Sequence, residues 1–269
     1  ARRQRQMCIR DRYKTFNPGT VNEKVALNGV SLKLNDGDFV TVIGGNGAGK
    51  STLLNAVAGT WKVDEGSILI DGIDVTKMQD YKRAKFLGRV FQDPMMGTVP
   101  TMGIDENLAL AARRGKFRGL AREITAKERA GFKEIVKILD LGLEDRLTSK
   151  VGLLSGGQRQ AVTLLMASLK KPKLLLLDEH TAALDPKTAA KVLDATETIV
   201  DRDHLTTLMI THNMKDAIAH GNRLIMMKDG KIILDISGEE KKNLTVEELL
   251  EKFNSVGGED AVNDRMILG

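Results

Sequence analysis

Residues 44–52 read GGNGAGKST, and this stretch constrains the fold more than any other part of the chain. It matches the pattern G-x-x-x-x-G-K-[ST], whose glycines let several backbone N–H groups point into one phosphate-sized concavity. The apolar run at residues 38–43 precedes it and predicts a buried strand. Residues 52–59 follow with helical spacing and a glycine stop. A strand, a glycine loop and a helix N-terminus in this order predict a nucleotide phosphate site.

The loop supplies most of the residues that we expect to bind the nucleotide. They are Gly44, Gly45, Asn46, Gly47, Ala48, Gly49, Lys50, Ser51 and Thr52. Lys50 is expected to reach the β- and γ-phosphates, and the Ser51 hydroxyl is expected to bind Mg2+.

Composition limits the kinds of protein that the chain can be. Of its 269 residues, 42% are hydrophobic, which is enough for a sizeable core. Aromatic residues make up only 4%, which argues against a surface that stacks nucleic-acid bases. The chain has no run of eighteen apolar residues and no visible secretory signal, so we expect neither a membrane span nor export.

Residues 1–12, ARRQRQMCIRDR, differ from the rest of the chain. They resemble the translation of a sequencing adapter, and we expect them to be disordered and the first strand of the fold to be missing. Without them the chain has 36 basic and 35 acidic residues, so its basic character is weak evidence for a nucleic-acid partner. The only cysteine, Cys8, also lies there, and the remainder fits a reducing cytoplasm.

The order of the expected elements predicts an α/β fold. Short apolar strands at 174–178 and 206–211 indicate a mostly parallel sheet that is covered on both faces. Two strands within 25–43, a strand at 67–70 and a hairpin at 223–236 indicate an additional antiparallel β portion.

A long helical segment interrupts this α/β core. We place an inserted helical subdomain at about residues 93–161, because a structureless loop of that length is uncommon. The predicted domain as a whole covers residues 13–254, and residues 255–269 form a C-terminal tail.

An acidic pair follows the apolar strand that ends in LLLLDE. Asp178 is expected at the carboxyl end of this strand, where ligands bind in open α/β sheets, and a carboxylate there suits Mg2+. Glu179, the next residue, is placed to act as the general base for a water that attacks the γ-phosphate.

The third motif is LSGGQ at residues 154–158. A small hydroxyl, two glycines and the start of a helix form a nest for an anion. Together with the phosphate loop and the acidic pair, this motif resembles the signature of ABC-type ATPases. The resemblance implies that Ser155, Gly156, Gly157 and Gln158 bind the γ-phosphate of an ATP held by the opposite subunit.

The resemblance assigns further roles. Gln92 resembles the Q-loop glutamine that contacts Mg2+ and water and connects to membrane subunits. Asp185 resembles the D-loop aspartate that crosses a dimer interface, and His212 the switch histidine on the γ-phosphate. Phe16 resembles the aromatic residue that stacks on adenine. His180 departs from the family, because many members have proline there; we expect it to alter loop stiffness and not chemistry.

The same resemblance implies what the ATPase works with. Two copies, or this chain and a paralogous ATPase subunit, are expected to pack head to tail around two ATP molecules. Separate transmembrane permease subunits and an extracytoplasmic substrate-binding protein are the implied partners, which places the chain at the cytoplasmic face of the membrane. The implied function is that of an ATPase subunit of a bacterial importer of a small, amino-acid-like solute.

Three alternatives stay open at this point. The chain could serve an exporter, or it could be a soluble ABC ATPase that acts on ribosomes or DNA. The latter types carry two cassettes or a long coiled coil, and this sequence has neither a second cassette nor heptads. A P-loop kinase or GTPase would have no use for LSGGQ.

Overall fold

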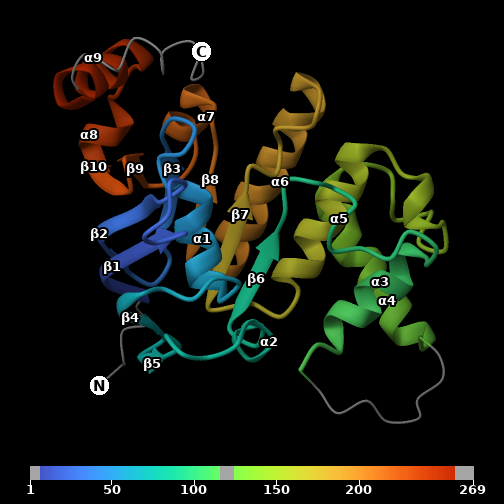
Figure 1. The fold of residues 1–269 in the computed structure, drawn as a ribbon. Coiled ribbons are helices and arrows are strands. Elements are labelled where there is room, and N and C mark those ends of the chain that lie inside the picture. Colours follow the sequence, from blue (N-terminus) through green and yellow to red (C-terminus); the bar gives the residue numbers. More distant parts are fainter. Residues whose placement is uncertain (1–6, 116–123, 258–269) are drawn as a thin grey trace, which may run out of the picture. The chain divides into compact units, whose positions relative to one another are not determined.

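The computed structural model of the chain describes residues 7–115 and 124–257 (Figure 1). The fold divides into two compact units. One is formed by Ala1–Phe86 together with Thr206–Gly269, and the other by Leu87–Leu205. In the described ranges, no helix is both long enough and apolar enough to cross a lipid bilayer.

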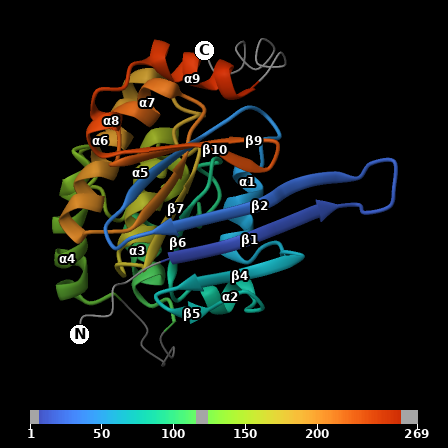
Figure 2. The same ribbon diagram turned by 90° about the vertical axis from the view of Figure 1, so that its left-hand side faces the viewer.

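An antiparallel sheet makes up one part of the first unit, with the strand order β2-β1-β4-β5. Its strands are β1 (Met7–Phe16), β2 (Lys24–Leu34), β4 (Glu65–Ile70) and β5 (Ile73–Asp74). Figure 2 shows β2, β1 and β4 side by side. In β2 the buried residues Val30, Leu32 and Leu34 alternate with the exposed residues Ser31 and Lys33. One face of this sheet is therefore packed and the other is solvated.

Parallel strands make up the other β portion of this unit. Strand β3 (Phe39–Ile43) lies between β8 (Thr207–Ile210) and β9 (Arg223–Lys228) and runs parallel to both. Strand β10 (Lys231–Ser237) forms the predicted antiparallel hairpin with β9. Every residue of β3 and β8 is buried, as the continuous apolar runs predict.

The described residues of the first unit form five helices. They are α1 (Lys50–Ala58), α2 (Asp80–Arg83), α7 (Met214–Ala219), α8 (Gly238–Lys242) and α9 (Val246–Gly257). A capping box begins α9, because Glu248 N–H donates to Thr245 Oγ1 at 3.2 Å and Thr245 N–H donates to Glu248 Oε2 at 3.0 Å. Leu249 and Phe253 of this helix are buried in an apolar cluster that includes Ile236.

The second unit combines a parallel strand pair with most of the helical part of the chain. Strand β6 (Leu87–Val90) pairs with β7 (Leu174–Asp178). Between them in the sequence lie α3 (Ile104–Ala112), α4 (Ala126–Val136), η1 (Lys137–Leu139), η2 (Val151–Leu153) and α5 (Gly156–Ser168). Helix α6 (Pro186–Asp203) follows β7. The predicted helical insertion into an α/β core is thus observed. Its boundaries at residues 93 and 161 stay a prediction, and residue 161 lies inside α5.

The expectation for the N-terminus is wrong in part. Residues 7–12 belong to β1, which fills the position of the first strand by pairing with both β2 and β4. Met7 and Ile9 are two residues apart on β1 and are almost fully buried, whereas Arg10 is exposed. This period of two fits a strand in a sheet with one packed face. Residues 1–6 lie outside the described residues, as does most of the predicted tail, from residue 258 onward.

Arg12, at the end of that segment, is an unusual core residue. Its side chain is completely buried. Nη1 donates to the carbonyl oxygen of Glu65 at 2.9 Å, whereas Nε and Nη2 have no hydrogen-bond partner among the described residues. Burial lowers the pKa of Arg12 to about 10, although the nearby carboxylate of Asp74 acts in the opposite direction. A buried cation with incomplete hydrogen bonding costs stability.

We therefore expect Arg12→Met to stabilise the protein. An unbranched apolar side chain replaces the partly unsatisfied cation, so the free energy of unfolding should rise by about 1–4 kcal/mol. Equilibrium urea unfolding followed by circular dichroism measures the change. Arg10→Met is the matched control, because Arg10 lies on the same strand and is exposed, and it should change stability by less than about 0.5 kcal/mol. A less stable Arg12→Met variant would contradict this account.

Candidate nucleotide-binding site

The glycine loop connects β3 to α1 in the first unit, as predicted. Gly44 has a φ of +150° and Gly49 a φ of +100°, which are conformations that favour glycine. A Cβ on Gly44 would collide with the carbonyl oxygen of Met227, and one on Gly49 with that of Ala26. Backbone from two other strands thus packs directly on the loop, and only glycine fits at these two positions.

Lys50 is the first residue of α1 and is 7% exposed. Its Nζ donates to the carbonyl oxygens of Gly44 at 2.7 Å and Gly45 at 3.1 Å. The ammonium group therefore lies against the loop that it is predicted to serve. Ser51 is exposed, and the first turn of α1 has no acidic residue, so the positive end of the helix dipole is not offset there.

Parallel pairing brings His212 to the same edge of the sheet. Val42 of β3 is paired with Ile210 of β8, and Thr211 N–H donates to the carbonyl oxygen of Val42 at 3.1 Å. The loop that begins at Gly44 and the exposed His212 therefore follow neighbouring strand ends. The resemblance to ABC-type ATPases assigns the switch histidine to this strand end, and the contact of His212 with the γ-phosphate stays a prediction.

Phe16 is the last residue of β1, and its ring has an aromatic and a cationic neighbour that the sequence does not predict. The Trp61 ring is 5.0 Å away between centroids at an interplanar angle of 80°, and Lys14 Nζ lies 5.5 Å from the Phe16 centroid. Asp64 accepts from Lys14 Nζ at 2.8 Å and from the N–H of Thr15 at 2.7 Å. Although partial burial acts to raise the pKa of Asp64, these hydrogen bonds hold it below its usual value.

In the second unit, the parallel pair β6–β7 brings Gln92 and the acidic residues to one edge. Val90 is paired with Leu177, so Asp178, the last residue of β7, and Gln92, two residues beyond β6, lie at neighbouring strand ends. Asp178 Oδ2 forms an ion pair with Arg89 Nη2 at 3.1 Å, and both side chains are mostly buried. The sequence analysis missed Arg89, because nothing in the pattern connects a residue of β6 with the end of β7.

Glu179 has a φ of +45°, which is a strained conformation for a residue with a Cβ. Its carbonyl oxygen accepts from the N–H of Ala182 at 3.0 Å, so the strained backbone closes a turn directly after the strand. His180 is buried, and its Nε2 lies 3.2 Å from Thr196 Oγ1 on α6. Instead of the stiff ring of proline, a side-chain contact with α6 fixes the chain here.

The signature motif forms the N-terminus of α5. Ser155 Oγ accepts from the N–H of Gln158 at 3.3 Å, and Gln158 Oε1 accepts from the N–H of Ser155 at 3.1 Å. These reciprocal bonds are a capping box, which fixes the predicted nest on the exposed end of the helix. Ser155 and Gly156 are exposed, while Gly157 is buried against Thr188 of α6.

Asp185 is at the N-terminus of α6, as Ser155 is at the N-terminus of α5. Its Oδ1 accepts from the N–H of Thr188 at 3.1 Å, so Asp185 is the N-cap of the helix. Hydrogen bonds from Thr188 lower the pKa of Asp185, and the carboxylate is exposed. Because Gly156 and Gly157 both lie close to this segment, the signature motif and Asp185 share one surface of the second unit.

Gln160, which the sequence does not single out, connects α5 with the segment that contains Gln92. Gln160 of α5 is completely buried, and its Nε2 donates to the carbonyl oxygen of Phe91 at 2.8 Å. Phe91 directly precedes Gln92, so this bond holds the Q-loop against the helix that begins at the signature motif.

The described part of the chain contains no group of three or more His, Cys, Asp or Glu residues that could hold a metal by itself. The predicted residues fall into two groups. Phe16, residues 44–52 and His212 belong to the first unit, whereas Gln92, residues 155–158, Asp178, Glu179 and Asp185 belong to the second.

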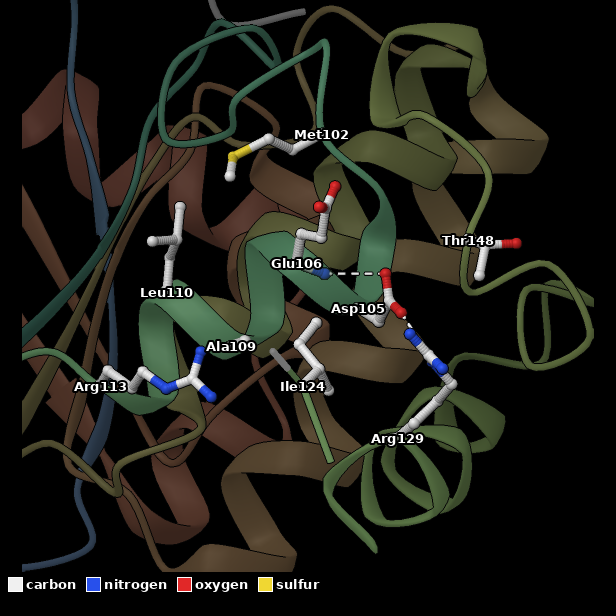
Figure 3. Close-up of a pocket in the computed structure, with 9 residues that line it drawn as sticks. All are labelled: Met102, Asp105, Glu106, Ala109, Leu110, Arg113, Ile124, Arg129 and Thr148. Atoms are coloured by element: carbon white, nitrogen blue, oxygen red, sulfur yellow. Dashed lines mark hydrogen bonds and ion pairs between the residues drawn. The ribbon is translucent and has the colours of Figure 1, made fainter. Parts of the chain in front are cut away.

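A cavity of about 620 Å³ also lies in the second unit, away from these residues in the sequence (Figure 3). Its lining consists of Met102, Asp105, Glu106, Ala109, Leu110, Arg113, Ile124, Arg129 and Thr148. Its charged groups have partners: Asp105 pairs with Arg129 at 2.8 Å and Arg113 with Glu128 at 3.1 Å. These ion pairs tie α3 to α4.

The glycine loop after β3, the acidic pair after β7 and the signature motif at α5 define a P-loop ATPase of the ATP-binding cassette class. The chain belongs to the ABC transporter family: residues 27–182 match the family described as ABC transporter.

Relatives agree with this assignment. The chain is 46% identical over 245 residues to the tyrosine transport ATP-binding protein of Clostridioides difficile strain R20291, covering 91% of this chain and 97% of that protein. The ABC transporter ATP-binding protein YxdL of Bacillus subtilis strain 168 is 33% identical over 237 residues, covering 87% of this chain and 88% of that protein.

Solved structures show the same fold. The dimeric ABC transporter cassette MJ0796 gives a TM-score of 0.72 at 31% identity, covering 86% of this chain and 98% of that one. The ADP conformation of the cassette MJ1267 gives a TM-score of 0.73 at 27% identity, with 93% and 98% covered. The chain is therefore an ATP-binding subunit of an ABC transporter and an ATPase, with the predicted P-loop core.

The contact between Gly157 and α6 generates a prediction about stability. Gly157→Ala should lower the free energy of unfolding by about 1–3 kcal/mol, because its Cβ would overlap Thr188 Cγ2. Adding Thr188→Ser removes that methyl group and should restore most of the loss. Urea unfolding of both single variants and the double variant measures the coupling.

Gly131→Ala on α4 is the matched control, because no atom lies within 4 Å of the Cβ that it would add. It should leave stability unchanged or raise it by up to about 1 kcal/mol. An equal loss in Gly157→Ala with and without Thr188→Ser would show that the contact with α6 is not the cause.

Proposed function

We propose that this chain is the ATPase subunit of a bacterial importer of an amino-acid-like solute and that it works as a head-to-tail dimer. The single observation that carries the proposal is the presence of one phosphate loop at the N-terminus of α1 and one signature motif at the exposed N-terminus of α5, in a chain that is 46% identical to a tyrosine transport ATP-binding protein.

The proposed nucleotide contacts follow the geometry of each unit. The loop amides and Lys50 hold the phosphates, Phe16 stacks on adenine, and His212 contacts the γ-phosphate from the adjacent strand end. The exposed Ser155 and Asp185 face a second copy of the chain. Closure of the dimer is favoured because it adds charge-assisted hydrogen bonds to the shared phosphate.

The proposed metal is Mg2+. The hydroxyl of Ser51, the amide oxygen of Gln92 and the carboxylate of Asp178 are hard oxygen donors of the kind that Mg2+ prefers. Within its own unit, Ser51 is exposed, and Asp178 has a second carboxylate oxygen beyond the one that accepts from Arg89. When bound, the metal neutralises charge on the β- and γ-phosphates. Glu179 accepts the proton of the attacking water.

Exposed apolar side chains support a membrane partner. Met95, Met96 and Val99 follow Gln92 in the second unit and are 47%, 50% and 39% exposed. Leu153 is 74% exposed, and the neighbouring Gly152 N–H donates to the carbonyl oxygen of Pro100 at 2.9 Å, so Leu153 lies near this segment. We propose these residues as a docking surface for permease subunits, which places the chain at the cytoplasmic face of the membrane.

The solute and the direction of transport rest on similarity. The relative from Clostridioides difficile is named for tyrosine transport, which favours an amino-acid-like solute and an extracytoplasmic binding protein. Other relatives are named for import of spermidine and putrescine or of aliphatic sulfonates, at lower identity. The alternatives are an exporter and a soluble ABC ATPase.

Purification of the full chain from detergent-solubilised membranes, with mass spectrometry of what accompanies it, tests this proposal. We expect a polytopic membrane protein together with an extracytoplasmic binding protein, whose binding of tyrosine and other amino acids is then measured by calorimetry. A membrane protein with no binding protein would favour an exporter. Ribosomal or chromosomal partners would overturn the transporter proposal.

Glu179→Gln tests the assignment of the general base. The substitution should slow ATP hydrolysis by about 10²–10⁴-fold while ATP binding is kept, because the proton acceptor is lost and the phosphate contacts remain. In the presence of ATP, the dimeric form of the variant should then accumulate, and light scattering after size-exclusion chromatography detects it. Glu251→Gln, an exposed substitution of the same type on α9, should retain wild-type turnover. Undiminished turnover in Glu179→Gln would remove Glu179 from the mechanism.

Lys50→Ala should reduce ATP binding as well as turnover. It removes the cation that lies against the loop, so ATP affinity should fall together with turnover. Unchanged ATP affinity would contradict the proposed position of the phosphates.

A further inference from the structure

A second lysine lies at the phosphate loop. Lys24 is the first residue of β2, and a Cβ built on Gly47 would lie 2.8 Å from Lys24 Nζ. We propose that Lys24 is a further phosphate-binding residue for ATP and ADP that serves the α- and β-phosphates, an inference that rests on the proposed binding of the nucleotide at this loop.

The two lysines reach different parts of the loop. Lys50 Nζ is buried and bonded to carbonyl oxygens at the beginning of the loop, on Gly44 and Gly45. Lys24 Nζ lies at Gly47, which is exposed. Lys24 therefore adds positive charge on the accessible side of the loop, where Lys50 does not reach.

The ammonium group of Lys24 is not explained by contacts within the protein. Across residues 7–115 and 124–257 it makes no hydrogen bond and no ion pair, whereas Lys14 on the neighbouring strand pairs with Asp64. It lies close to the N-terminus of α1, where the helix dipole is positive and the first turn has no acidic residue. A cation in this position is repelled by its surroundings unless an anion joins it.

The strand register supports the choice of phosphates. Lys24 is paired with Phe16 across the antiparallel strands β1 and β2, so the two side chains leave the sheet on the same face. Phe16 is the proposed contact of adenine, and the loop is the proposed contact of the phosphates. The Cα of Lys24 lies beside Phe16, and its ammonium group lies at the phosphate loop. Its charge is therefore placed at the phosphates nearest the base.

Titrations of ATP, ADP and adenosine into the full-length protein test the inference. Trp61 is the only tryptophan of the chain, and its ring centroid lies 5.0 Å from that of Phe16, so its fluorescence reports on the base site. Lys24→Ala should weaken ATP and ADP binding equally, by about 3–10-fold, and leave adenosine binding unchanged. The loss should shrink as salt rises, because the site is exposed. Lys24→Arg should retain most of the affinity.

Lys33→Ala is the matched control. Lys33 lies on the same strand, is exposed, and has no side-chain hydrogen bond or ion pair among the described residues. It is nine residues away, which is about 30 Å along the strand. Its substitution should leave all three affinities unchanged.

Three results would count against the inference. Unchanged ATP and ADP affinity in Lys24→Ala would overturn it. A parallel loss of adenosine binding would also overturn it, since Lys24 would then act on the base site or the fold. Wild-type protein that binds no ATP would overturn the proposed function and, with it, the inference for Lys24.

Discussion

The parallel hydrogen-bond register of β3 with β8 and β9 is the constraint on which the nucleotide site of the first unit depends. Because all three strands run in one direction, the segments after Ile43, Ile210 and Lys228 emerge at one edge. The phosphate loop and His212 become neighbours there because β3 and β8 end side by side. The same rule in the second unit, through β6 and β7, brings Gln92 beside the acidic pair.

The loop itself is fixed by backbone that belongs to other strands. Carbonyl oxygens of Met227 and Ala26 pack so close to Gly44 and Gly49 that no side chain fits at either glycine. The N–H of Gly230 also donates to the carbonyl oxygen of Ala48 at 3.1 Å. The concavity is therefore shaped before any phosphate enters it, and little conformational entropy has to be lost on binding.

Local pattern explains how much of this was predictable. The loop, the strand before it, the helix after it and the hairpin of β9 and β10 are each encoded by adjacent residues, and all were predicted. The contacts of Arg89, Trp61 and Lys24 were not, because each joins elements that are distant in sequence and leaves no periodic signal. The N-terminal strand was missed for a different reason, since an unusual composition concealed the alternation that starts at Met7.

The missed contacts in the second unit orient the residues that the motifs identify. Arg89 Nη2 donates to Oδ2 of Asp178 at 3.1 Å, which restricts the orientation of the carboxylate that we propose as a metal ligand. Gln160 holds the carbonyl group of Phe91 and thereby the start of the Q-loop. Since Gln160 lies on the helix that the signature motif begins, a displacement of that helix would be transmitted to Gln92 through one buried hydrogen bond. In the proposed dimer, this bond connects the part of the chain that contacts the second copy with the part that contacts the metal and the membrane subunits.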